Sequence, residues 1–205
     1  MKLRFHRTHA VPAKVAQDIR GIIAAEDIRF PGVRLPDIDL VLVAGWNYYG
    51  VLGNTFFERT ITMIIDTKRP WRAIRRWAAP TFCHEIHHIG RFHTVGYGDR
   101  LSEAVVTEGL AVNYERERGW PAQTYGRKFS GSERQQILKT FQKESRRKDY
   151  GHPRWFFGAA NLPRAAGYRL GTELVADYCK RTGAKPSELV ATPASVILKN
   201  HPVLK

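Results

Sequence analysis

The chain has 205 residues, of which 43% are hydrophobic and 11% aromatic, which allows a globular domain with a sizeable core and excludes a disordered protein. No stretch approaches about 18 consecutive apolar residues, and residues 1–20 lack an apolar segment, so we expect no transmembrane helix and no signal peptide; the two cysteines fit a cytoplasmic protein. The net charge of +14 suits a polyanionic partner such as nucleic acid, but it also suits simple solubility, because the arginines are spread along the whole chain.

The first part of the chain predicts a helix followed by strands. Pro12 suits the first turn of a helix over 12–28, in which apolar residues recur at helical spacing. Residues 38–44 form an apolar run short enough for a buried strand. Glycine and asparagine over 45–54 indicate a turn or an open loop, and the β-branched stretch 56–66 predicts a second strand.

The rest of the chain is predicted to be mainly helical. The expected helices cover 70–77, 80–90, 101–117, 132–147 and a last long one from Arg164 or Tyr168 to Arg181. Pro80 is expected to begin a new helix and Gly90 to lie near its end, because proline suits a first turn and glycine a C-terminus. Ser102 is the expected N-cap of the helix over 101–117.

The stretch Cys83–His88 contains the pattern HExxH, formed by His84, Glu85 and His88. On a helix, residues four apart lie on one face with about 5–6 Å between their Cβ atoms, and two imidazoles at that spacing can bind one Zn²⁺. Glu85 follows the first histidine and can reach a metal-bound water, so it suits a general base. The alternative is a histidine-rich surface helix that contains the pattern by chance, with His87 as a bystander.

A catalytic zinc ion needs a third protein ligand, and the helix over 101–117 offers Glu103 and Glu108. The residues three, four and seven positions from Glu108 are nearly all apolar. An ionised carboxylate in such surroundings is costly unless a cation compensates it. The helical neighbours of Glu103 are less uniformly apolar, so the same argument is weaker for Glu103. We therefore expect Glu108 to be the ligand, and the alternative is that it pairs with one of the many arginines.

Several motifs follow one another in a specific order. They are HEIHHIGR, then Leu-Ser-Glu-Ala-Val-Val-Thr-Glu-Gly-Leu-Ala from Leu101, then Gly-Tyr-x-x-Gly from Gly167. This order resembles a bacterial family of predicted Zn-dependent proteases of unknown function, over roughly residues 41–198. The separation of His88 from Glu108, and the Glu-Gly-Leu-Ala string, are also similar to the gluzincins, the thermolysin-like HExxH…E metallopeptidases. One position departs from the thermolysin-like pattern. Four residues after the ligand, thermolysin-like enzymes carry an Asp that supports the metal site, and this chain has Val112 at that position.

The resemblance implies an α+β, zincin-like fold in one domain over residues 1–205. It would have an N-terminal α/β lobe over about 1–100, with a β-sheet and the active-site helix, and a helical lobe over about 101–205. It also implies a zinc metallopeptidase that acts on a peptide or protein substrate. His84, His88 and Glu108 would hold Zn²⁺, and Glu85 would be the general base.

Gluzincins commonly stabilise the oxyanion with a Tyr or His from the second lobe. Tyr168 is the first candidate for this role, with a core aromatic residue as the alternative. His152 is the second candidate, and the alternative is that this histidine, next to Pro153, is an ordinary loop residue. By analogy with the zincin fold, the strand over 60–66 would be the edge strand that pairs with an extended peptide.

A second class of function remains open from the sequence. The stretch 127–154 is rich in Lys and Arg, which fits either a solvated helix face or a contact with nucleic acid. The chain could thus be a basic nucleic-acid-binding protein with a structural or regulatory zinc site, or a protease that acts on DNA-bound proteins. No recognised nucleic-acid motif accompanies the charge. A structural zinc site is closed by four protein ligands, whereas a catalytic one keeps a position for water.

Overall fold

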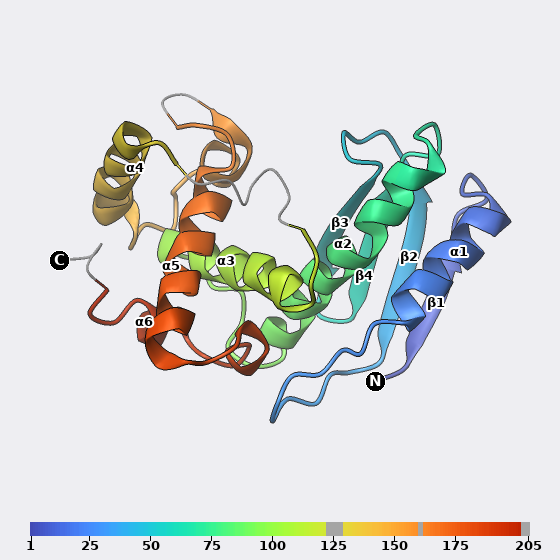
Figure 1. The fold of residues 1–205 in the computed structure, drawn as a ribbon, viewed down its shortest axis with the longest axis horizontal. Coiled ribbons are helices and arrows are strands. Elements are labelled where there is room, and N and C mark those ends of the chain that lie inside the picture. The colour runs from blue at the N-terminus through green and yellow to red at the C-terminus, as the bar shows by residue number, and fades with distance from the viewer. Residues whose placement is uncertain (122–128, 160–161, 202–205) are drawn as a thin grey trace. The chain divides into compact units, whose positions relative to one another are not determined.

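The computed structural model describes residues 1–121, 129–159 and 162–201. The chain forms two compact units, Met1–His93 and Thr94–Lys205. It combines a four-stranded sheet with helices (Figure 1), so the α+β class predicted from the sequence is confirmed. Among the described residues, every helix is too short or too polar to pass through a lipid bilayer.

The sheet of the first unit has the strand order β1-β2-β4-β3. Its strands are β1 (Leu3–Arg7), β2 (Ile38–Ala44), β3 (Val51–Phe57) and β4 (Thr60–Ile65). Strands β1, β2 and β4 are parallel, and β3 pairs antiparallel with β4. Strand β4 therefore has a neighbour on each side, and the expectation that residues 60–66 form an edge strand is wrong. The edge next to β4 belongs to β3.

The region expected as one strand over 56–66 is a hairpin. Residues 58 and 59 form its turn, and β3 begins within the segment 45–54 that was expected as a turn or an open loop. The turn consists of Glu58 and Arg59 and contains no Gly, Pro, Asn or Asp, so no typical turn residue marks where the chain reverses. Strand β1 was not predicted either, because its charged residues leave only two of its five positions partly buried.

Helices α1 (Ala13–Ala24) and α2 (Trp71–Phe92) lie side by side on one face of this sheet (Figure 1). Helix α2 is continuous, so the expected break before Pro80 is wrong. Proline inside a helix removes one hydrogen bond and costs about 3 kcal/mol. The segment from Ala78 to Arg91 is buried throughout, and the apolar surface that it buries outweighs this cost.

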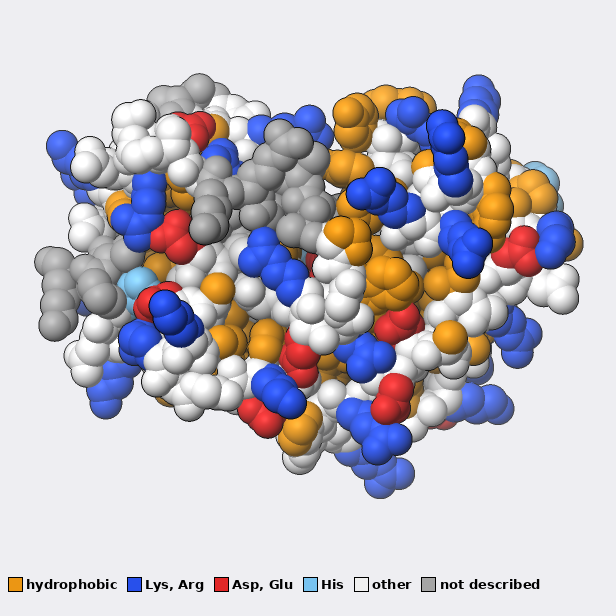
Figure 2. All heavy atoms as spheres, viewed as in Figure 1, with side chains coloured by type: hydrophobic (Ala, Val, Ile, Leu, Met, Phe, Trp, Pro, Cys, Tyr) orange, Lys and Arg blue, Asp and Glu red, His pale blue; other side chains and the backbone are white. Residues whose placement is uncertain are grey.

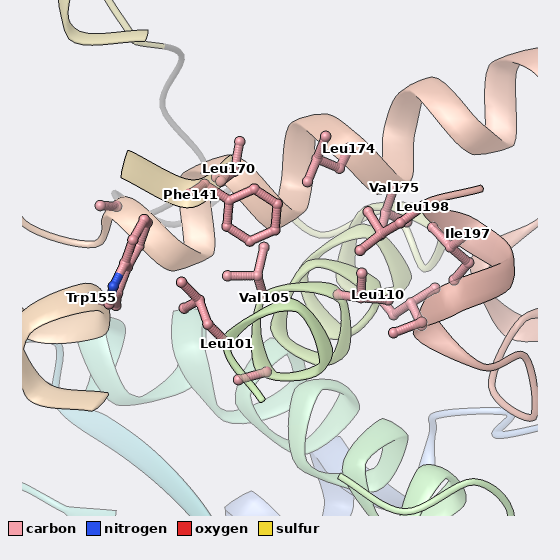
Figure 3. Packing of buried hydrophobic residues seen from close by; sticks show 14 of the residues in the cluster. Leu101, Val105, Leu110, Phe141, Trp155, Leu170, Leu174, Val175, Ile197 and Leu198 are labelled. Atoms are coloured by element: carbon pink, nitrogen blue, oxygen red, sulfur yellow. The ribbon is translucent and has the colours of Figure 1, made fainter. Parts of the chain in front are cut away.

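The second unit is helical and is built around α3 (Leu101–Glu117) and α5 (Ala166–Thr182). The remaining elements are α4 (Gly131–Glu144), a π-helical turn η2 (Arg154–Gly158), a 3₁₀ turn η3 (Pro186–Glu188) and the short α6 (Ala194–Ile197). Their apolar side chains meet in one cluster, in which Val105 of α3 lies toward Leu170 of α5, and Leu110 of α3 lies toward Ile197 of α6 (Figure 3).

Helices α3 and α5 touch backbone to backbone at two glycines. A Cβ atom added to Gly109 would lie 2.2 Å from the carbonyl carbon of Gly171, and one added to Gly171 would lie 2.0 Å from the carbonyl oxygen of Val105. The Asn113 amide links the helices by donating to the carbonyl oxygens of Gly109 (2.7 Å) and Thr172 (3.0 Å). The glycine that follows Glu108 in the sequence motif is thus required by packing.

Candidate metal centre

His84 and His88 lie on one face of α2, as the four-residue spacing predicts. Both are buried, with 7% and 6% of their surface exposed. Their rings meet edge to face, with 4.7 Å between the ring centroids. Two imidazoles that are this close, and largely shielded from water, can present nitrogen atoms to a single ion.

His87 of the motif and Cys83, which precedes the motif, make different contacts. The ring of His87 packs edge-on against Phe30, with 5.5 Å between centroids. The Cys83 thiol lies 3.6 Å from a carboxylate oxygen of Glu26. His87 and Cys83 are therefore occupied with packing inside the first unit, on the side of α2 that does not carry His84 and His88.

Glu85 is also buried, with 6% of its surface exposed, and it contacts strand β3. The Thr55 hydroxyl donates a hydrogen bond to Oε2 of Glu85 at 2.7 Å. Gly53, two residues earlier on the same strand, lies against the same carboxylate. The sequence did not point to either residue, because both lie about 30 positions before Glu85 and carry no motif.

Glu108 is buried on α3, with 5% of its surface exposed, and the Tyr97 hydroxyl donates a hydrogen bond to its Oε1. Burial, and then the charge of Glu108, raise the pKa of Tyr97 well above its usual value, so the phenol keeps its proton and remains a donor. The Asp that thermolysin-like enzymes carry four residues after the ligand is absent here, and Tyr97 supplies a polar partner for Glu108 from the preceding loop.

Glu103 has a different role from Glu108. Its Oε2 accepts hydrogen bonds from the backbone N–H groups of Asp99 (3.1 Å) and Arg100 (3.0 Å). The N-cap of α3 is Arg100, so the expectation that Ser102 caps this helix is wrong. Glu103 satisfies backbone donors at the helix start, where its negative charge also suits the helix dipole.

His84, His88 and Glu108 form a buried group of three possible metal ligands, and one ligand atom from each lies within 4.8 Å of the others. Two imidazole nitrogens and one carboxylate oxygen are a donor set that zinc enzymes use at catalytic centres. A buried carboxylate also needs a compensating cation. The chemistry of these three residues therefore fits Zn²⁺.

The two candidates for oxyanion stabilisation both pack against Phe156 of the π-helical turn. The His152 ring stacks on Phe156 with 4.4 Å between centroids, and the Tyr168 ring meets Phe156 edge to face at 5.1 Å. Burial lowers the pKa of His152, and the charge of Glu108 partly opposes this. The roles of Tyr168 and His152 in stabilising an oxyanion stay predictions.

The basic residues are distributed over the surface and partly paired. Figure 2 shows Lys and Arg side chains scattered over the face that it draws, with acidic side chains among them. In the described part of the stretch 127–154, carboxylates pair with four basic residues, namely Arg134, Arg147, Lys148 and Arg154. Arg127 and Lys128 lie outside the described residues. Binding of nucleic acid stays a prediction.

Comparison with known protein families agrees with the chemistry of this group. A family model described as "Predicted Zn-dependent protease (DUF2268)" matches residues 50–199, which is most of the chain and includes all three possible ligands. Comparisons with curated proteins and with solved structures gave no match. The resemblance to a family of predicted Zn-dependent proteases is confirmed, and the metal named by the family description is the one that the donor set fits.

Proposed function

Because the chain belongs to this family of predicted Zn-dependent proteases, we propose that it is a zinc metallopeptidase of the gluzincin type, which hydrolyses peptide bonds. The observation that carries the proposal is the buried group of His84, His88 and Glu108, with Glu85 next to the first histidine. These three residues would hold the metal. When bound, Zn²⁺ supplies Lewis acidity, which lowers the pKa of water to about 7 and polarises a carbonyl group.

Glu85 is the proposed general base. Its carboxylate would accept a proton from the water that attacks the peptide carbonyl and would pass this proton to the nitrogen of the leaving amine. Glu85 is buried and directly follows the possible ligand His84 in the chain, which suits this role. The Tyr168 hydroxyl is our first candidate to donate a hydrogen bond to the developing oxyanion, and His152 is the second.

The substrate is proposed to be an extended peptide that pairs with strand β3. This strand is at the edge of the sheet, and an edge strand offers backbone N–H and C=O groups to an added strand. Its residue Thr55 contacts Glu85, so a peptide on this edge would approach the proposed base. Leu52, Phe56 and Phe57 of β3 are exposed and could contact apolar side chains of such a peptide.

Removal of the metal tests the proposal directly. We expect the purified protein to contain about one zinc per chain, to hydrolyse fluorescein-labelled casein, to lose this activity on dialysis against a chelator, and to regain it when Zn²⁺ is returned. Elemental analysis measures the zinc content, and the fluorescence assay measures the rate of casein hydrolysis. Activity that persists after complete metal removal, or a protein that binds no zinc at neutral pH, would contradict the assignment.

Tyr97→Phe should weaken zinc binding without unfolding the protein. The variant loses the hydroxyl that donates to Glu108, and outer partners of metal ligands are typically worth about 10–100-fold in metal affinity. Competition with a chromogenic chelator measures the dissociation constant. Tyr178→Phe removes a hydroxyl from α5 of the same unit and should leave the affinity unchanged. Equal affinities in the two variants would show that the Tyr97 hydroxyl does not support the ligand.

A further inference from the structure

Strand β3 contacts both oxygens of the Glu85 carboxylate. Thr55 donates to Oε2 at 2.7 Å and lies 3.3 Å from the Glu85 backbone oxygen. On the other side, a Cβ atom added to Gly53 would lie 2.6 Å from Oε1 and 2.5 Å from Cγ. We propose that Gly53 and Thr55, the Glu85 contact pair, orient this carboxylate for proton transfer. This inference rests on the proposed function of Glu85 as general base.

Thr55 is a positioning residue in this proposal. Its hydrogen bond occupies Oε2 and restricts rotation of the carboxylate about its last carbon–carbon bond. Because threonine is β-branched, its own χ1 angle is restricted, and a strand is a more rigid support than a loop. Oε1 is then the oxygen that takes the proton. A base that is held in its reactive orientation reacts faster than one that also samples unproductive orientations.

Gly53 contributes by its lack of a side chain. Gly53 does not have a positive φ angle, so its backbone conformation is one that alanine also adopts. Glycine is therefore not needed here for the turn of the chain. It is needed for space, because any Cβ atom would collide with Glu85 and, at 2.7 Å, with the Thr81 methyl group. The free space lies beside Oε1, the oxygen assigned to proton transfer.

The pairing of β3 with β4 is irregular next to Thr55, which supports a role for this segment in directing the Thr55 side chain. The register shifts between Asn54 and Phe57, so Thr55 lies in an irregular stretch where β3 has one more residue than β4. Such bulges are frequent next to active sites, where they redirect side chains. Gly53 is paired with Met63 and Asn54 with Thr62, so Gly53 faces α2 with the buried Met63, whereas Thr62 faces the opposite side of the sheet.

Substitutions at Thr55 test the proposal through the separation of kcat from KM. Thr55→Val should lower kcat for labelled casein at least about 10-fold while KM changes less than about twofold, because the base is misdirected and substrate binding is not affected. Thr55→Ser keeps the hydroxyl and should restore most of kcat. Thr62→Val is the matched control and should behave as the wild type. Zinc content should be equal in all four proteins.

A measurement that does not use activity separates this inference from the proposed function. Thr55→Val, which removes the donor, and Glu85→Ala, which removes the acceptor, form singly and together a double-mutant cycle on the melting temperature. If Thr55 bonds Glu85, the shift of the double variant differs from the sum of the single shifts; additive shifts would overturn the inference even in an active zinc enzyme. A kcat of Thr55→Val equal to that of the wild type would also overturn it. Absence of zinc would instead overturn the proposed function, while the cycle would still decide the contact.

Gly53→Ala provides the second variant. It should lower kcat at least as much as Thr55→Val, because the added methyl group moves the carboxylate itself. Far-ultraviolet circular dichroism and zinc content should match the wild type, since alanine suits the backbone at this position. A folded, zinc-loaded Gly53→Ala variant with undiminished kcat would show that the space beside Oε1 is not used, and it would overturn this part of the inference.

Discussion

Glu85→Gln should abolish hydrolysis and leave zinc binding intact. Glutamine has the same shape, and its amide oxygen can still accept the hydrogen bond from Thr55, but it cannot take a proton from water. Loss of a general base typically lowers the rate by about 10²–10⁴-fold. We therefore expect kcat/KM for labelled casein to fall within this range while elemental analysis still finds about one zinc per chain.

Glu58→Gln is the matched control for this variant. Glu58 lies in the turn between β3 and β4 and is exposed, so the same chemical change there should leave both activity and zinc content unchanged. If Glu85→Gln retained most of its activity, Glu85 would not be the base. If it lost both activity and zinc, Glu85 would be holding the metal, and the division of roles within the HExxH pattern would have to be revised.

Glu108→Ala should have the largest effect on metal affinity. The substitution removes one of the three proposed ligands and leaves the two imidazoles of α2 alone. Since partners that only support a ligand are worth about 10–100-fold, loss of the ligand itself should weaken zinc binding by more than about 100-fold. Competition with a chromogenic chelator at constant pH measures the dissociation constant.

Glu103→Ala, five residues earlier on the same helix, gives the contrast. Glu103 accepts backbone N–H groups at the start of α3, so its loss should reduce the free energy of unfolding by about 1 kcal/mol and leave the zinc affinity close to that of the wild type. Urea denaturation and the chelator titration report these two effects separately. The opposite pattern, with affinity lost in Glu103→Ala and kept in Glu108→Ala, would exchange the assignments of the two glutamates.

The parts of the structure that the sequence predicted well depend on local patterns. The helix over 101–117 and the strand over 38–44 have the predicted boundaries, because apolar spacing and flanking residues mark both ends. Glu108 was expected to join His84 and His88 partly because it is a carboxylate within an apolar helix face, and mainly because its separation from His88 resembles that of the gluzincins. The helix and the strand were thus predicted from patterns within one element, whereas Glu108 was also predicted from a family resemblance.

The parts that the sequence did not predict depend on contacts between distant segments. Pro80 indicated a helix end, but burial of its neighbours keeps α2 continuous. Tyr97 lies 11 positions before Glu108, in a loop without periodicity, and Thr55 lies 30 positions before Glu85. A hydroxyl that bonds a distant carboxylate leaves no trace in local spacing, so only the folded arrangement identifies these partners.

The glycine crossing of α3 and α5 has a consequence for protein engineering. Glu108 and Gly109 are neighbours with separate roles, the first in the proposed metal binding and the second in the close approach to Gly171. Random mutagenesis across this helix would therefore yield many inactive clones for reasons of folding alone. A library intended to alter substrate preference should hold Gly109 and Gly171 constant. It should place its diversity at exposed positions such as Phe56 and Phe57, where a changed side chain does not have to fit between two backbones.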